Sequence, residues 1–202
     1  MNDTRERILD EALKLFLQKN YKGVTMKDIV KSTGLSKGAF YHYFESKEKI
    51  FEEVINSLTV SFAVFESLDC SKFTLAEFYR YIADFTNEFQ EKLFKKNVTH
   101  ATDSSFTANF YFMMFDGIIL IPDFRQKMLA YQKKELNAWV SVITRAKRSG
   151  EIKSTMPDSQ IAKIFISTSD GIMLGTIIGD QFDTLKKELL KTWDSFYKLL
   201  KN

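Results

Sequence analysis

The chain of 202 residues is 45% hydrophobic and 27% charged, the proportions of an ordinary soluble globular protein, which argue against a disordered, collagen-like or membrane-spanning chain. Its one cysteine, Cys70, excludes an intramolecular disulfide framework, and its charged N-terminal segment lacks the apolar core of a signal peptide, so we expect a cytoplasmic protein. The net charge is +3, and residues 1–50, with ten basic and seven acidic side chains, hold the whole excess. A small basic excess confined to one segment is a modest indication of nucleic-acid binding.

The first 62 residues are predicted to form four helices with tight connections. Thr25 and Asp28 have the spacing of a capping box, and Gly34 suits the left-handed conformation of a turn. Ser36 can cap the very short helix that follows. Helical spacing of apolar residues places these four helices at about 3–20, 26–33, 36–43 and 46–62.

The pattern after residue 62 is again helical, and no alternation of apolar and polar residues predicts a strand. The chain has only two prolines, Pro122 and Pro157, which suits long helices because proline breaks helix interiors. We therefore expect an all-α fold of about nine helices. The later ones are predicted at about 74–95, 106–120, 123–149, 157–179 and 184–200.

Residues 24–50 carry the functional signal. A helix, a glycine-containing turn and a second short helix form the helix-turn-helix pattern, whose second helix enters the DNA major groove. Gly38 and Ala39 are small enough for close approach to base edges, and Lys37 can reach guanine or a phosphate. The free N–H groups at the helix start near Thr25 favour a phosphate. The candidate DNA-binding residues are Thr25, Lys27, Ser36, Lys37, Gly38, Ala39, Tyr41, His42, Tyr43 and Lys47.

A helical hairpin with solvated lysines and structural tyrosines would have the same spacing, but the residue types are more specific. Residues 5–51 resemble the N-terminal domain of the TetR family of bacterial repressors, most clearly in the run SKGAFYHYFESKE at 36–48. Val30 and Thr33 depart from the alanines common in the family, which bears on packing more than on DNA contact. The matching residues are Ile8, Ala12, Phe16, Gly23, Thr25, Ile29, Gly34, Ser36, Gly38, Phe40, Tyr41, Tyr43, Phe44, Ser46 and Lys47.

The resemblance implies two domains. The first, residues 1–47, would bind DNA. The second, residues 48–202, would be a helical domain that binds a small molecule and dimerises through its last two helices. The helix that connects the two domains, starting near Ser46, would transmit ligand binding to the DNA-binding domain.

Three glycines at i, i+4 and i+8 support dimerisation independently. Because glycine costs about 1 kcal/mol in a helix interior, this stripe indicates that another helix packs very close, in a partner or in the same subunit. Two helices from each subunit would form a four-helix bundle, and the dimer would read a palindromic operator in double-stranded DNA. The candidate interface residues are Gly171, Gly175, Gly179, Leu185, Leu189, Trp193 and Phe196.

Aromatic and methionine residues are abundant, with 19 phenylalanines, and they suit an adaptable apolar pocket as well as a bulky core. We expect a hydrophobic or aromatic effector. Asp116 and Asp170 lie in apolar segments, but the sequence gives no reason to prefer a cationic ligand over a helix cap or a salt bridge. The candidate ligand-binding residues are Phe85, Phe89, Phe110, Met113, Met114, Phe165, Ser169 and Met173.

An enzyme is not expected. The two histidines are His42, in the proposed DNA-binding helix, and His100, which with Asp103 would make a poor metal site. Cys70 has no evident base partner that would make it a catalytic nucleophile. We expect neither a metal nor a cofactor. The sequence thus predicts a homodimeric regulator, most simply a repressor that a small molecule releases from its operator. An activator, or a helical interaction protein without specific DNA binding, would fit the same pattern.

Overall fold

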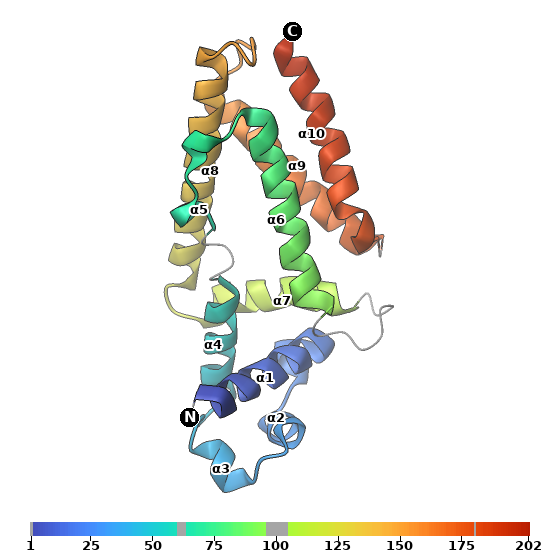
Figure 1. The fold of residues 1–202 in the computed structure, drawn as a ribbon. Coiled ribbons are helices and arrows are strands. Elements are labelled where there is room, and N and C mark those ends of the chain that lie inside the picture. Colours follow the sequence, from blue (N-terminus) through green and yellow to red (C-terminus); the bar gives the residue numbers. More distant parts are fainter. Residues whose placement is uncertain (1, 60–63, 96–104, 180) are drawn as a thin grey trace. The chain divides into compact units, whose positions relative to one another are not determined.

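The computed structural model describes residues 2–59, 64–95, 105–179 and 181–202, and within these ranges every regular element is a helix (Figure 1). The predicted all-α fold is therefore confirmed. His100 and Asp103 lie outside the described residues. The α-helices are α1 (Asn2–Gly23), α2 (Met26–Thr33), α3 (Lys37–Tyr41), α4 (Lys47–Thr59), α5 (Val64–Ser67), α6 (Leu75–Lys95), α7 (Ser105–Leu120), α8 (Phe124–Arg148), α9 (Asp158–Ile178) and α10 (Leu185–Lys201).

The predicted helix boundaries agree closely with the structure, with three local differences. Helix α1 continues to Gly23, but Asn20 has a non-helical backbone (φ 55°, ψ 175°) that marks a kink where the sequence placed the end. Helix α3 ends at Tyr41, two residues before the expected Tyr43. The short helix α5 and two 3₁₀ turns, η2 (Cys70–Lys72) and η3 (Phe182–Thr184), were not predicted.

The chain forms two compact units. Unit 1 contains Met1–Phe62 and Phe94–Met128, and unit 2 contains Ala63–Leu93 and Leu129–Asn202. Helix α7 therefore joins helices α1–α4 in unit 1, although some 45 residues separate it from α4 in the sequence. The predicted boundary between residues 47 and 48 separates a DNA-binding domain from a ligand-binding domain, and this division of function stays a prediction. The compact unit 1 extends beyond that boundary.

Unit 1 is built around helix α1, whose residues Ile8, Ala12 and Phe16 are completely buried. Helix α7 packs along α1, and the side-chain amide of Asn109 donates a hydrogen bond to the Leu17 carbonyl oxygen at 2.8 Å. On α7, Gly117 faces the ring of Phe124 so closely that an added Cβ would lie 3.1 Å from it. A glycine at this position is what allows α7 and the start of α8 to approach.

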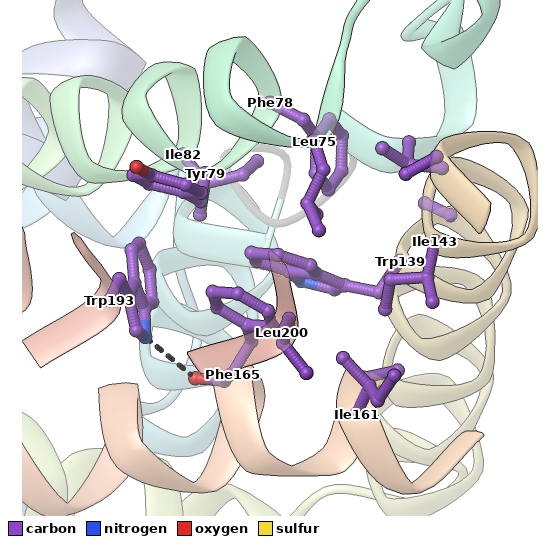
Figure 2. Packing of buried hydrophobic residues seen from close by; sticks show 14 of the residues in the cluster. Leu75, Phe78, Tyr79, Ile82, Trp139, Ile143, Ile161, Phe165, Trp193 and Leu200 are labelled. Carbon is purple, nitrogen blue, oxygen red and sulfur yellow. Dashed lines mark hydrogen bonds between the residues drawn. The ribbon is translucent and has the colours of Figure 1, made fainter. Parts of the chain in front are cut away.

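Unit 2 has an aromatic core contributed by α6, α8, α9 and α10 (Figure 2). The rings of Trp139 and Phe165 stack with centroids 4.7 Å apart, and Trp193 packs edge-on against both. The indole N–H of Trp193 donates hydrogen bonds to the Phe165 carbonyl at 3.2 Å and to the Thr168 hydroxyl at 3.0 Å. These bonds satisfy the polar edge of a buried indole and fix α10 against α9.

The predicted interface stripe on the last helix needs a correction. Leu185, Leu189 and Trp193 are buried in the core of their own unit 2, so these side chains do not face outward to a partner. An amphipathic pattern gives the apolar side of a helix but not whether that side meets the same subunit or another one.

The glycines of α9 do face outward. A Cβ added at Gly171 or Gly175 would meet no other atom within 4 Å apart from the helix's own backbone. Close packing inside one subunit, the alternative reason for these two glycines, is therefore excluded for the described residues. Leu174 and Ile178 on the same helix are 51% and 78% exposed.

Candidate nucleic-acid interface

The turn between α2 and α3 has the predicted local structure. The Asp28 amide donates to the Thr25 hydroxyl at 3.2 Å, and the Thr25 amide donates to the Asp28 carboxylate at 2.9 Å, which completes the predicted capping box. Gly34 adopts the left-handed conformation at φ 67°. The Ala39 amide donates to the Ser36 hydroxyl at 3.3 Å and starts α3 at this point. The helix-turn-helix thus begins and ends where its capping residues require.

Helix α3 is held by one buried side chain and leaves the rest of its surface open. Phe40 is completely buried, and the next residue, Tyr41, is 42% exposed. Lys37, Gly38, Ala39 and His42 are also exposed. The helix therefore presents a small, basic and hydroxyl-bearing face, which is the composition that contacts base edges and phosphates.

The start of helix α2 differs from the expected phosphate site in one respect. Both the amide and the hydroxyl of Thr25 donate to the carboxylate of Asp28. These hydrogen bonds hold the pKa of Asp28 below its ordinary value, and the bond from the hydroxyl has the larger effect. A protein carboxylate thus occupies donors that were expected to face a phosphate, and a DNA contact of Thr25 stays a prediction.

Lys47 has a structural role that the sequence did not reveal. Its ammonium donates to the backbone carbonyls of Tyr21 at 3.0 Å and Val24 at 2.9 Å, and it lies 4.1 Å from the centroid of the Tyr21 ring. These contacts join α4 to the end of α1 and the start of α2. An ammonium has three N–H donors, so one remains for the predicted phosphate contact.

Tyr21 and Glu48 extend this junction. The Tyr21 hydroxyl donates to the Glu48 carboxylate at 3.1 Å. Burial, followed by this hydrogen bond, raises the pKa of Tyr21 to about 12, so the phenol stays protonated at physiological pH. Arg5 on α1 forms a further ion pair of 2.5 Å with Glu53 on α4. Contacts at Glu48 and at Glu53 thus hold the first two turns of α4 against α1.

The predicted ligand-binding residues divide between the two units. Three lie in unit 1 and five in unit 2, so they do not form one cluster within either unit. Met113 and Phe165 are completely buried in the packed core of their own units, as the core interpretation of the aromatic stripe expects. The unit 1 residues are Phe110, Met113 and Met114, and the unit 2 residues are Phe85, Phe89, Phe165, Ser169 and Met173.

Within the described ranges, no group of three or more His, Cys, Asp or Glu side chains could hold a metal ion. Cys70 is a free, partly buried thiol, and burial raises its pKa. A thiol is a weak nucleophile when its pKa is raised.

The sequence has relatives among bacterial regulators. Residues 8–54 match the family model described as "Bacterial regulatory proteins, tetR family". IcaR of Staphylococcus aureus (strain Newman), the negative transcriptional regulator of the biofilm operon icaADBC, is 26% identical over 110 residues, which are 53% of this chain and 59% of IcaR. YuxN of Bacillus subtilis (strain 168), an HTH-type transcriptional regulator, is 43% identical over 56 residues, 28% of this chain and 19% of YuxN. The chain covers less than two thirds of the length of either relative.

Solved structures share the fold along nearly the whole chain. The TetR family transcriptional regulator PfmR from Thermus thermophilus has a TM-score of 0.64 at 21% identity, with 96% of both chains covered. A TetR-family regulator from a Rhodococcus species has a TM-score of 0.65 at 13% identity, with 99% of this chain and 100% of the other covered. The helix-turn-helix segment thus matches the tetR family of bacterial regulatory proteins, and the chain shares the fold of solved TetR-family regulators along nearly its whole length.

Proposed function

We propose that the protein is a DNA-binding transcriptional repressor that acts in the cytoplasm as a homodimer and leaves a palindromic operator when a small hydrophobic molecule binds. The observation that carries the proposal is the open face of helix α3. Ser36 and the buried Phe40 fix the helix, while Lys37, Tyr41 and His42 are exposed. The relative IcaR is a negative regulator, which supports repression as the direction of control.

A second copy is needed because a five-residue recognition helix reaches few bases. Two copies related by a two-fold axis would read two half-sites about one helical turn apart, roughly 34–36 Å in general. The avidity of two linked modules also raises affinity without any new type of contact. The operator is therefore proposed to be palindromic.

The outward face of α9 supports dimerisation. Leu174 and Ile178 are exposed, and Gly171 and Gly175 leave open space beside them. This helix is long and apolar enough to span a membrane, with 22% of its most apolar window buried. Lys163 and Asp170 would be costly in hydrocarbon, however. A partner helix on the glycines accounts for both the exposure and the small side chains.

Fluorescence anisotropy tests the DNA-binding part of the proposal. The full chain is titrated onto labelled DNA from upstream of its own gene and onto scrambled DNA, at physiological salt. We expect a preference of about 10³-fold or more for upstream DNA, lost in Tyr41→Ala and weakened in Lys37→Ala. Lys187→Ala removes the same charge from an exposed position on α10 and should leave binding unchanged.

Two results would oppose the proposal. Equal, weak binding to both DNAs would indicate a non-specific basic segment instead of operator recognition. No binding even at low salt, where phosphate contacts are strongest, would favour the alternative of a helical interaction protein without specific DNA binding.

A further inference from the structure

Helix α1 contains a strained residue shortly before the helix-turn-helix. Asn20 has φ 55° and ψ 175°, a combination close to the region that is essentially restricted to glycine. Such strain persists only where surrounding contacts hold the backbone in place, and it is concentrated at functional sites and switch regions. The Asn20 side chain accepts a hydrogen bond from the Gly23 amide at 3.0 Å. The kink thus separates the body of α1 from residues 21–24, which lead into α2.

The kink leaves one backbone carbonyl of α1 without its helical donor. In a regular α-helix the Leu17 carbonyl accepts from the Tyr21 amide, but the non-helical angles of Asn20 turn that amide away. Asn109 of α7 supplies the missing donor, because its side-chain amide reaches the Leu17 carbonyl at 2.8 Å. Leu17 is completely buried and Asn109 is 7% exposed, so water has little access to replace this bond. Loss of Asn109 would favour a straight α1, in which the Tyr21 amide satisfies the carbonyl.

Contacts beyond the kink connect its geometry to the helix-turn-helix. Lys47 on α4 donates to the carbonyls of Tyr21 at 3.0 Å and Val24 at 2.9 Å. In a straight helix the Tyr21 carbonyl would accept from the Thr25 amide. That amide instead donates to Asp28 in the capping box that starts α2. The kinked conformation is therefore the one that agrees with both the Lys47 contact and the capping box.

Helix α2 is also attached to the body of α1 at its other end. The guanidinium of Arg7 donates to the carbonyl of Thr33, the last residue of α2, at 3.3 Å. The first end of α2 is connected through residues 21–25 to the kink. With both ends fixed in this way, the orientation of α2 depends on the backbone angles of Asn20. The tight turn at Gly34 passes this orientation on to α3.

We propose that Asn109 is a positioning residue for DNA recognition. Through the Leu17 carbonyl it holds the Asn20 kink, and the kink sets the orientation in which α2 and α3 meet DNA. Asn109 acts from α7, outside residues 8–54, which match the family model. The inference deepens the proposed function and rests on its DNA-binding part. If only a fraction of the molecules has a kinked α1, the apparent affinity for DNA falls in proportion to that fraction.

Fluorescence anisotropy of the full chain on its upstream DNA tests the effect on recognition. We expect Asn109→Ala to bind about tenfold more weakly, under conditions where circular dichroism shows the variant to be folded. Ile8→Val removes a buried methyl group from the body of α1 and lowers stability without touching the kink. Its affinity should stay within about twofold of the natural chain. Unchanged affinity in Asn109→Ala, or an equal loss in both variants, would overturn the positioning role.

A matched pair of substitutions at Asn20 tests the kink and leaves Asn109 in place. Asn20→Ala and Asn20→Gly both remove the side chain that accepts from the Gly23 amide. Alanine favours a straight helix, whereas glycine adopts a positive φ readily. We therefore expect Asn20→Ala to bind the upstream DNA about tenfold more weakly than Asn20→Gly. Equal affinities, or weaker binding by the glycine variant, would contradict the proposal even if Asn109→Ala fails to fold.

A measurement without DNA separates failure of this inference from failure of the proposed function. NMR of the full chain labelled with carbon-13 and nitrogen-15 asparagine reports the Cα chemical shift of Asn20, whose signal is assigned by its absence from Asn20→Gly. In Asn109→Ala we expect this shift to move toward the value of a helical asparagine. An unmoved shift would show that Asn109 does not hold the kink, whether or not the protein binds DNA.

The two readouts together decide each part. A shift that moves while DNA affinity is unchanged would reject the role of the kink in recognition. A shift that moves in a protein that binds no DNA would reject the proposed function, and with it the role in recognition, while the hold of Asn109 on the kink is retained. A moved shift together with weakened DNA binding supports both proposals.

Discussion

The side-chain amide of Asn109 on α7 donates a 2.8 Å hydrogen bond to the Leu17 carbonyl oxygen on α1, across 92 positions of the sequence. Asn109 is buried, so its removal leaves a polar backbone group without this partner inside unit 1. We expect Asn109→Ala to lower the free energy of unfolding by about 1–3 kcal/mol. Urea unfolding followed by circular dichroism measures this change.

The control for this prediction is Asn137→Ala on α8, where the side chain is exposed. A surface change of this kind usually stays within about 0.5 kcal/mol. Equal losses in the two variants would contradict a specific role for the bond between Asn109 and Leu17.

Two glycines of the helix-turn-helix should respond oppositely to alanine. Gly34 has φ 67°, a conformation that costs other residues about 1–2 kcal/mol, so Gly34→Ala should be destabilised by that amount. Gly38 lies in α3 with open space around an added Cβ, so Gly38→Ala should gain about 0.5–1 kcal/mol. The added methyl would nevertheless face the DNA and weaken operator binding. Unfolding and anisotropy curves for both variants check the prediction, and a stable Gly34→Ala would refute it.

Removal of the Lys47 ammonium should destabilise the junction of α1, α2 and α4. Lys47→Met leaves the Tyr21 and Val24 carbonyls without their charged donor, and we expect a loss of about 1.5–3 kcal/mol in the free energy of unfolding. Lys49→Met changes a more exposed lysine of the same helix and should have little effect, as surface ion pairs contribute little.

The salt dependence of DNA binding then separates the two roles of Lys47. Each phosphate contact contributes about 0.9 to the slope of log affinity against log salt concentration. Lys37→Met should reduce the slope by about this amount. The same reduction in Lys47→Met would assign the remaining N–H of Lys47 to a phosphate, and an unchanged slope would leave it a structural residue alone.

The stability of the free protein should fall as pH rises from about 4.5 to 7. Burial and, second, the charge of Asp170 raise the pKa of Glu135 from 4.5 to about 7 in the fold, so the unfolded chain ionises this carboxyl first and the folded state is progressively disfavoured. The penalty is complete above pH 7. Because Glu135 keeps partial solvent contact, we expect the free energy of unfolding to fall by about 1–3 kcal/mol in total.

Glu135→Gln isolates this contribution. The variant should be more stable than the natural chain at pH 8 by about 1–3 kcal/mol, and the gain should largely disappear near pH 5. Urea unfolding at both pH values measures the difference. A variant less stable than the natural chain at pH 8 would show that Glu135 supports the fold.

The proposed dimer depends on the glycines of α9. Gly175→Leu places a large side chain where the single chain has open space, so the subunit should fold normally or gain up to about 1 kcal/mol of helix stability. A close partner helix would be blocked. We expect sedimentation velocity to give a dimer for the natural chain and a monomer for the variant. Ser141→Leu on an exposed part of α8 should remain dimeric, and an intact Gly175→Leu dimer would move the interface elsewhere.

The local structure of the helix-turn-helix could be predicted because short-range chemistry determines it. The capping box of Thr25 and Asp28, the left-handed Gly34 and the cap at Ser36 each involve residues at most three positions apart. Such interactions depend little on the rest of the fold.

Tertiary contacts were harder to predict. The stripe of Leu185, Leu189 and Trp193 enters the core of its own unit, because helical periodicity does not specify the surface that an apolar face meets. Lys47 was expected at a phosphate because the sequence does not reveal the two carbonyls that α1 and α2 bring to its ammonium.

The discontinuous order of unit 1 has a consequence for synthesis on the ribosome. Helices α1–α4 leave the exit tunnel before α7 has been translated, because α4 ends at Thr59 and α7 ends at Leu120. At about 5–20 residues per second, translation from the end of α4 to the end of α7 takes roughly 3–12 s, and the α7-binding side of α1 is uncovered throughout this interval. Since Asn109 and Leu17 can pair only after this interval, the helix-turn-helix acquires its complete supporting core late in translation.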